Sequence, residues 1–581
     1  MRFRALALDY DGTIAQHGEL HHDVRSAIEE ARGQGIAVIL VTGRILKDLR
    51  RVAGDLDFLD AVVAENGAVL AFPEKGRTMI LTHPPSPVLI EELRRRDIHA
   101  VAGECIIEAD ASHAQRILEV IRELELPLVI AFNRSRLMIL PPSVSKATGL
   151  HKALSFFRLS PHNTIAIGNA ENDHAMLDLC ELGLAVQWGS PALKAVADEV
   201  LEGPDPGAIA AYIRKISAEP RLPKVHRRRK LLLGSAEDGK PLYLEVGGRN
   251  ILIAGGSGSG KSWLAGLLCE QLILQEYSVC VIDPEGDYSL LEALPGVVVF
   301  TEECEPHFGN LERIFRYPGS SVVVDLSKMS PVKRLDYVPA LLKMLDALRR
   351  QTGLPHRIFV DEAHYFLYGP GDHQVLDLDM ASYTLVSFQV SRLDPSVVNA
   401  SEAIIITREN DPAEVSHLHS LLGGQGSNME WQAFLGTLAS NEAALLQCTD
   451  ESKCRLRSFR IASRLTSHIR HRHKYLDTPV SPKKAFVFSS QGGLAGRCAN
   501  SLAEFITLVS ACSSEVLKNH MRRHDFSRWI RDVFRDIPLA SQVHEMEMRY
   551  HLMRDSEIKV SLKKLIWDRY MPITPSVLTT N

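Results

Sequence analysis

The sequence predicts an α/β protein built in three parts, two of which handle phosphate groups and the last of which is helical. Three observations predict this fold class. An apolar run at 251–254 passes into a glycine-rich loop that ends in Gly-Lys-Ser at residues 260–262. Near the N-terminus, a short apolar strand delivers Asp9 and Asp11 into a glycine turn. Between residues 477 and 581, apolar side chains recur at helical spacing.

Length and composition indicate a modular protein without a strong overall charge. At 581 residues the chain can form three or four domains, since a domain averages about 150 residues. Its net charge of -5 gives no global attraction to nucleic acid. No apolar run reaches the roughly 18 residues that span a bilayer, and Met1 leads directly into a strand, so we expect a cytoplasmic protein without a membrane partner. The nine cysteines form no Cys-x-x-Cys pair, and we expect them to be reduced and buried.

The first domain, predicted at residues 1–215, carries the parts that phosphoryl transfer requires. Asp9 and Asp11 lie two residues apart, so one carboxylate can attack phosphorus while the other moves protons. The reaction also needs donors for the phosphate oxygens, a positive charge and a metal ion. These follow in order: Thr42 after a strand at 36–41, Lys146 at the start of a helix, and Asn169 and Asp173 after a strand at 163–168.

These four stations resemble the haloacid dehalogenase (HAD) phosphatase superfamily, and in particular its Cof-like (type IIB) branch. The resemblance implies a Rossmann-like domain with a small α+β cap at about 82–132, which selects a phosphorylated small-molecule substrate. It also implies that Asp9 is the nucleophile that forms an aspartyl-phosphate, Asp11 the general acid and base, and Thr42 a phosphate ligand. Lys146 would hold both the nucleophile and the phosphate. The implied Mg2+ ligands are Asp9, the backbone carbonyl of Asp11, Asn169 and Asp173.

Asn169 departs from the pattern of that family, which usually has aspartate at this position. An amide oxygen can still coordinate Mg2+, but the lost negative charge lowers the expected metal affinity. The sequence therefore leaves two interpretations open, an active phosphatase and a regulatory domain.

The glycine-rich loop opens the second domain, predicted at residues 236–476, in the context expected of a phosphate-binding loop. Glycines let backbone N–H groups turn toward a triphosphate at a helix N-terminus. The lysine reaches the β- and γ-phosphates and the serine hydroxyl ligates Mg2+. The residues concerned are Gly255, Gly258, Gly260, Lys261 and Ser262.

Later strand ends supply the other groups that ATP hydrolysis needs. Asp361 can hold Mg2+ through water, and Glu362 can orient the attacking water. Gln389 follows a strand and is suited to sensing the γ-phosphate. Arg408 ends another strand and in a ring could face the nucleotide of a neighbouring subunit.

Together these motifs resemble the HerA/FtsK-type ATPases, a RecA-like class of ring-forming P-loop motors. The resemblance implies ATP and Mg2+ as cofactors and a homo-oligomer, with a hexameric ring as the form that the family suggests. Members commonly act on DNA. Here a phosphatase-like domain stands in place of their N-terminal barrel, so DNA is one alternative partner rather than an established one.

One basic stretch precedes the second domain and another lies near its end. Residues 216–235 combine prolines with a basic run and predict an exposed linker. His468, His471 and His473 alternate with arginine and lysine, which would repel a cation. That alternation indicates a basic strand or helix end rather than a metal site.

The predicted helical domain at 477–581 resembles an accessory domain of unknown function with a His…Asp-Phe-Ser-x-Trp pattern. Here the pattern reads His520, Asp525 and Trp529. The histidine and aspartate can bind a ligand; alternatively, Asp525 caps a helix and Trp529 packs in the core.

Three functions remain open from the sequence. The first is an Mg2+-dependent phosphomonoesterase fused to an ATPase. The second is a nucleic-acid motor with a regulatory HAD domain, and the third is a nucleotide-dependent switch that gates the phosphatase.

Overall fold

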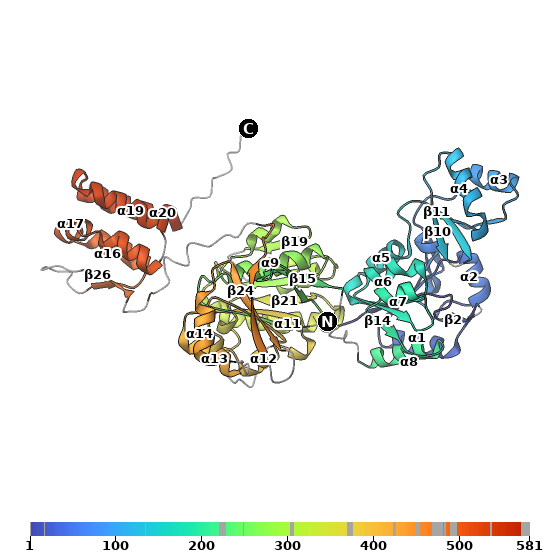
Figure 1. Cartoon of the computed structure of the whole chain (residues 1–581), viewed down its shortest axis with the longest axis horizontal. Coiled ribbons are helices and arrows are strands. Elements are labelled where there is room, and N and C mark those ends of the chain that lie inside the picture. The colour runs from blue at the N-terminus through green and yellow to red at the C-terminus, as the bar shows by residue number, and fades with distance from the viewer. Residues whose placement is uncertain are drawn as a thin grey trace. The chain divides into compact units, whose positions relative to one another are not determined.

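The computed structural model divides the chain into two units, 1–284 with 288–468 and 469–581 with 285–287, which we describe separately (Figure 1). It describes residues 2–16, 18–133, 135–219, 228–247, 249–301, 307–368, 376–421, 426–448, 454–466, 480, 484–488, 497–534 and 537–570. The predicted histidine cluster at 468–473 lies outside these residues. Among them, no helix is both long enough and apolar enough to cross a membrane.

The first sheet is a mostly parallel α/β sheet whose central strands are apolar without interruption, because both of its faces are covered. At one edge, β6 runs antiparallel to both of its neighbours, β5 and β7. The strands, in sheet order, are β14 (Glu199–Leu201), β13 (Leu182–Val186), β12 (Thr164–Gly168), β1 (Ala5–Leu8), β4 (Ala37–Val41), β5 (Ala61–Ala64), β6 (Val69–Phe72) and β7 (Arg77–Ile80). The helices are α1 (His22–Gly33), α2 (Leu46–Ala53), α5 (Lys146–Phe157), α6 (His174–Leu179), α7 (Pro191–Val196) and α8 (Gly207–Ala218).

A separate antiparallel sheet with two helices forms the predicted cap. Its strands are β10 (Val129–Asn133), β11 (Arg136–Leu140), β9 (Ile107–Asp110) and β8 (Ala100–Ala102), and its helices α3 (Pro87–Arg95) and α4 (Ala114–Glu123) lie side by side (Figure 1). The sheet continues beyond the expected limit of 132, because β11 pairs with both β10 and β9.

The ATPase-like part is built on an 11-stranded sheet. Its order is β16 (Pro241–Glu245), β15 (Lys230–Ala236), β25 (Cys454–Ile461), β24 (Glu442–Cys448), β23 (Ala403–Thr407), β17 (Ile251–Ala254), β22 (Tyr383–Ser387), β21 (Arg357–Val360), β18 (Val279–Asp283), β20 (Ser321–Asp325) and β19 (Val297–Phe300). Strands from β23 to β19 are parallel, and the other four are antiparallel. The helices are α9 (Lys261–Leu274), α10 (Phe308–Ile314), α11 (Pro331–Thr352), α12 (Pro395–Asn399), α13 (Pro412–Leu421) and α14 (Asn428–Thr437).

The predicted linker at 216–235 overlaps regular structure at both ends, since α8 continues to Ala218 and β15 occupies Lys230–Ala236. β15 begins at Lys230 and pairs with β16 and β25. Arg228 is also held, since its guanidinium donates to Asp198 and to the Leu177 carbonyl. The end of the basic run is therefore fixed to the protein rather than solvated, because Asp198 and the Leu177 carbonyl accept hydrogen bonds from Arg228.

The C-terminal unit combines helices with a short hairpin that the sequence did not predict. The hairpin pairs β26 (Phe486–Phe488) with β27 (Arg497–Ala499). The longer helices are α16 (Leu502–Ala511), α17 (Ser514–Arg522), α18 (Asp525–Trp529), α19 (Ile537–Arg549) and α20 (Asp555–Tyr570), and they pack around an aromatic core. Cys498 of β27 is exposed, which contradicts the expectation of buried cysteines, whereas Cys512 is buried.

Candidate functional sites

The predicted phosphatase residues meet at the carboxyl ends of β1, β4 and β12. Lys146, the first residue of α5, places its Nζ 2.6 Å from Oδ1 of Asp9 and 2.6 Å from Oδ1 of Asp173. Thr13 donates to the other oxygen of Asp9 at 2.8 Å. α5 is oriented there by a capping box at Ser145. One cation thus joins the predicted nucleophile to a predicted metal ligand.

Burial and charge determine the electrostatics of this cluster. Burial and the nearby Asp173 carboxylate raise the pKa of Asp9, while Lys146 opposes that rise. Burial alone would lower the pKa of Lys146, but the carboxylates of Asp173 and Asp9 raise it above its usual value. The lysine is therefore charged and favours the ionised, nucleophilic form of Asp9.

Asn169 and Asn172 provide buried polar atoms that fit a metal ion. The side-chain oxygen and nitrogen of both residues are shielded from solvent and have no hydrogen-bond partner among the described residues. Asp173 is oriented, because its Oδ2 accepts from the backbone N–H groups of Asn169 at 2.8 Å and Ala170 at 2.9 Å. Buried polar atoms without partners are costly, and coordination to a hard cation relieves that cost.

Asp11 is held differently from the way the sequence suggested. Arg44, two residues after Thr42, donates to both oxygens of Asp11 at 2.6 Å. Arg44 also binds Asp48, and its pKa is raised chiefly by the hydrogen bond to Asp11. Proton transfer by Asp11 therefore requires its carboxylate to leave Arg44, which sequence reasoning did not anticipate.

The cap is attached through Glu65, another residue that the sequence did not single out. Its buried carboxylate accepts from the backbone N–H groups of Glu104, Cys105 and Ile106 at the base of the cap. Met138 of β11 lies so close to Gly43 that a Cβ on this glycine would stand 3.2 Å from the methionine sulfur. The cap thus contributes Met138 directly above the Thr42 loop.

The phosphate-binding loop has the expected form between β17 and α9. Gly255 has φ of 140°, and a Cβ there would stand 2.1 Å from the Thr407 hydroxyl, so glycine is required. Ser259 and Thr407 hydrogen-bond at 2.5 Å. Nζ of Lys261 donates to the Gly256 carbonyl at 2.8 Å. The lysine side chain therefore lies against its own loop, within reach of an incoming phosphate.

The predicted acidic pair lies one strand away from this loop. Asp361 and Glu362 directly follow β21, and β22 separates β21 from β17. Both carboxylates are buried, and Glu362 has a left-handed backbone with φ of 49°. His364 places Nδ1 3.6 Å from Oε2 of Glu362. The turn therefore holds the predicted catalytic carboxylate in a buried, strained conformation, as functional turns often do.

Gln389 and Arg408 lie just after β22 and β23, the two strands that flank β17. The Gln389 side chain accepts from Arg392 at 3.3 Å. The Arg408 carbonyl accepts from the Gly256 N–H at 2.9 Å, which places its main chain at the loop of its own chain. Its role toward a neighbouring subunit stays a prediction.

Glu409 is a further residue at the phosphate-binding loop that the sequence analysis missed. A Cβ on Gly256 would stand 3.4 Å from its carboxylate. Burial raises the pKa of Glu409, while backbone N–H groups and nearby Lys261 oppose the rise. Glu409 belongs to no sequence motif. It reaches the loop because it follows β23, which lies beside β17 in the sheet.

The phosphatase-like and ATPase-like sheets meet at a buried polar junction, formed by the residues before β12, β13, β18 and β21. His162 places Nδ1 2.8 Å from Glu181, and Tyr277 donates to the same carboxylate at 2.7 Å. The two rings stack at 3.7 Å. Nε2 of His162 lies 2.7 Å from the Gln275 carbonyl. These contacts join one sheet to the other.

His356 and Asn163 form the second half of this junction. His356 Nδ1 accepts from the Ser278 N–H at 2.7 Å, and its Nε2 lies 3.0 Å from the Asn163 side-chain oxygen. This pattern fits the neutral imidazole, which donates from one nitrogen and accepts at the other. Burial lowers the pKa of His356 well below its usual value.

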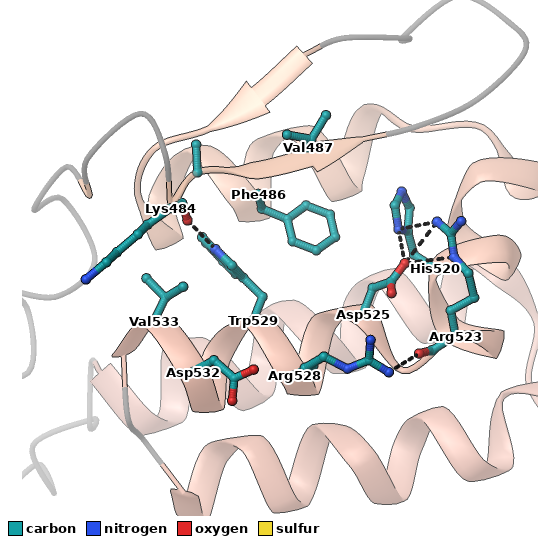
Figure 2. A pocket seen from close by; sticks show the side chains of 11 residues that line it. Lys484, Phe486, Val487, His520, Arg523, Asp525, Arg528, Trp529, Asp532 and Val533 are labelled. Carbon is teal, nitrogen blue, oxygen red and sulfur yellow. Dashed lines mark hydrogen bonds and ion pairs between the residues drawn. The ribbon is translucent and has the colours of Figure 1, made fainter.

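The predicted His520 and Asp525 lie together in a pocket of ≈ 670 Å³ in the C-terminal unit (Figure 2). Asp525 Oδ2 is 2.8 Å from Nδ1 of His520 and accepts from Arg523 at 2.9 Å. Asp525 is the first helical residue of α18 and not its N-cap, which is His524. Trp529 is buried as expected and donates to the Lys484 carbonyl at 2.9 Å.

Comparisons with known proteins match two parts of the chain. Residues 6–95 and 83–213 match the family model of haloacid dehalogenase-like hydrolases, and residues 233–353 match the model of the central domain of helicase HerA.

Curated relatives match about as much of the chain as the haloacid dehalogenase-like family model does. A phosphoglycolate phosphatase of Methanothermobacter thermautotrophicus is 26% identical over 221 residues, which cover 36% of this chain and 98% of that protein. Phosphoglycolate phosphatase 2 of Saccharolobus solfataricus is 29% identical over 222 residues, 36% of this chain and 91% of that protein. A crystal structure of a haloacid dehalogenase-like hydrolase from Bacteroides thetaiotaomicron aligns with a TM-score of 0.33 and 18% identity, over 37% of this chain and all of that one.

Proposed function

Because the chain carries a haloacid dehalogenase-like hydrolase domain followed by a HerA-type ATPase domain, we propose that it is an Mg2+-dependent phosphomonoesterase coupled to an ATP-hydrolysing partner domain. The observation that supports the first activity is the cluster of Asp9, Lys146 and Asp173, with Lys146 2.6 Å from both carboxylates. The curated phosphoglycolate phosphatases suggest small phosphorylated acids as the first substrates to test.

In this proposal Asp9 attacks the phosphorus atom and its Oδ forms the bond to phosphate, while the alcohol leaves. Asp11 gives the leaving oxygen a proton and then takes one from the water that hydrolyses the aspartyl-phosphate. Thr42 and the backbone beside it bind the phosphate oxygens, and Lys146 neutralises their charge. Mg2+ held by Asp9, the Asp11 carbonyl, Asn169 and Asp173 would stabilise the charge that develops on those oxygens.

In the second domain, Lys261 and the loop glycines bind the ATP phosphates, and Ser262 and Asp361 hold the nucleotide's Mg2+. Glu362 orients the attacking water, Gln389 senses the γ-phosphate, and in a ring Arg408 faces the nucleotide of a neighbouring subunit. A homo-oligomeric ring and a DNA partner rest on the helicase HerA match alone. DNA-stimulated ATP hydrolysis tests the second of these.

The first test measures phosphate release from an aryl phosphate with Mg2+ and without ATP. We expect turnover that EDTA abolishes. Asn169→Asp adds a negative charge to the metal site and should lower the half-saturating Mg2+ concentration by about tenfold. Glu171→Gln, an exposed residue of the same turn, is the matched control and should change nothing. Absence of turnover in both the wild type and Asn169→Asp would contradict an active phosphatase.

The buried junction supports a second candidate function, in which nucleotide state alters the phosphatase. Asn169 and Asp173 follow β12, and Asp361 and Glu362 follow β21. The junction joins the starting ends of these two strands. A shift of β21 on ATP binding would therefore be transmitted to the phosphatase sheet through His356 and Asn163. Packed interfaces of this kind transmit small displacements.

Tyr277→Phe tests this coupling, because it keeps the ring stacked on His162 and removes the hydrogen bond to Glu181. We expect ATP with Mg2+ to change the wild-type phosphatase kcat/KM, and this change to shrink in the variant while basal rates stay within about twofold. Tyr243→Phe, an exposed tyrosine of β16, is the control. An ATP effect of equal size in all three proteins would exclude a role of the junction.

His356 should also make the stability of this unit depend on pH. Its native pKa lies below the ordinary 6.5, so below pH 6.5 the unfolded chain binds a proton that the native state excludes. Stability should therefore fall as pH decreases from 6.5, by up to about 1.4 kcal/mol per pH unit. His356→Gln can keep both hydrogen bonds without titrating, and its melting temperature should decline less between pH 6.5 and 5. Parallel declines for the two proteins would show that His356 is not responsible.

A further inference from the structure

Three side chains of the C-terminal unit converge outside the pocket of Figure 2. His544 and Glu547 lie one turn apart on α19, and His524 is the residue before α18. One nitrogen of each histidine and one oxygen of the glutamate lie within 4.8 Å of one another. We propose that His524, His544 and Glu547 bind a divalent metal ion of the Zn2+ class.

The spacing of these atoms matches a metal coordination sphere. Nδ1 of His524 is 3.4 Å from Oε2 of Glu547, and Nδ1 of His544 is 3.7 Å from the same oxygen. Tetrahedral Zn2+ has metal–ligand bonds of about 2.0–2.1 Å, which puts neighbouring ligand atoms roughly 3.3 Å apart. An ion could therefore be enclosed by small movements of the side chains.

Glu547 is oriented before any ion binds. It is buried, and its Oε1 accepts from the N–H groups of Phe526 and Ser527, both at 3.1 Å. Its Oε2 accepts from the Ser527 hydroxyl at 2.5 Å and still has a lone pair for the histidines. Metal ligands commonly have partners of this kind, which fix their direction.

His524 supplies a second indication of a ligand. Its backbone is left-handed, with φ of 56°, which is uncommon outside glycine and orients the ring toward Glu547. Its Nδ1 is shielded from solvent and has no hydrogen-bond partner among the described residues. His544 has a side chain that is 52% exposed, so an ion can enter from solvent on that side.

The donor set defines the class of ion. Two imidazole nitrogens and one carboxylate oxygen suit Zn2+, Co2+ and Ni2+, whereas Mg2+ and Ca2+ prefer oxygen ligands throughout. The three ligands leave a fourth position for water or a bound group. Bound metal would also link the start of α18 to α19. The site is independent of the phosphatase and ATPase proposals, because it shares no residue with them.

Cobalt titration of the full-length protein tests the proposal. With millimolar Mg2+ present to fill the oxygen sites, four-coordinate Co2+ should produce strong visible bands that saturate with a one-site isotherm. Zn2+ should remove them. His544→Gln should weaken this binding by at least about 100-fold, since even the partners behind metal ligands contribute 10–100-fold. Glu547→Gln keeps an acceptor for the two backbone N–H groups and should have the same effect.

Two control variants separate this site from other histidines. His551→Gln changes an exposed histidine shortly after α19, and His471→Gln changes the histidine-rich stretch at 468–473. Both should bind Co2+ as the wild type does. Equal Co2+ titrations of the wild type and His544→Gln would overturn the proposal, and Glu547 would then be a metal-free cap for the start of α18. Because the His544 side chain is half exposed, its replacement is compatible with the fold, and near-UV circular dichroism verifies this.

Discussion

Asp9→Asn should abolish the phosphatase, with a loss on the order of 10⁴-fold or more in kcat. The amide cannot attack phosphorus, and the charge that binds Lys146 and the metal ion is lost with it. The structure predicts little damage to the fold, since Lys146 keeps its 2.6 Å contact with Asp173 and Thr13 can still donate to the new side-chain oxygen. Phosphate release from an aryl phosphate at saturating Mg2+ measures the loss.

Two comparisons make this result specific. Asp23→Asn removes an exposed carboxylate on α1 and should leave the rate unchanged. ATP hydrolysis by Asp9→Asn should remain close to that of the wild type, which shows that the chain is folded. If Asp9→Asn retains more than a few per cent of the phosphatase rate, Asp9 is not the nucleophile and the four-station assignment fails.

The predicted phosphatase residues Asp9 and Asp173 could be placed from the sequence because they follow apolar strands, and parallel strands end at one edge of a sheet. Lys146 reaches both carboxylates from the first turn of α5. Arg44 was not predicted as the partner of Asp11, although it lies only two residues after Thr42, because arginine near a turn is usually solvated. Glu409 carries no sequence signal, since it reaches the phosphate-binding loop through strand order.

The junction and the proposed metal site could not be predicted from sequence. His356 and Asn163 are far apart in the chain, and neither belongs to a motif. The start of β15 at Lys230 was hidden by the basic run before it, which is typical of linkers. His524 and His544 belong to no metal-binding sequence pattern, because the fold of α18 onto α19 brings them together.

Glu362→Gln should separate ATP binding from ATP hydrolysis. The carboxylate that we propose as the group orienting the attacking water becomes a neutral amide of the same size, so we expect ATP turnover to fall by about 10²–10⁴-fold. Lys261, Ser262 and Asp361 are unchanged, so ATP affinity should stay within a few-fold of the wild type. Release of phosphate from ATP and binding of a fluorescent ATP analogue measure the two quantities. Glu292→Gln, an exposed glutamate after β18, is the control.

This variant also gives the sharpest test of the predicted ring. Because it would hold ATP without hydrolysing it, any nucleotide-dependent assembly should accumulate rather than turn over. Light scattering of Glu362→Gln should give the mass of one 64.5 kDa chain without nucleotide and a multiple of it with ATP and Mg2+. Arg408→Ala should block ATP turnover without blocking assembly if the arginine serves a neighbouring subunit. A single-chain mass under all conditions would contradict both the ring and the role of Arg408 across subunits. Arg408 would then act only at the phosphate-binding loop of its own chain.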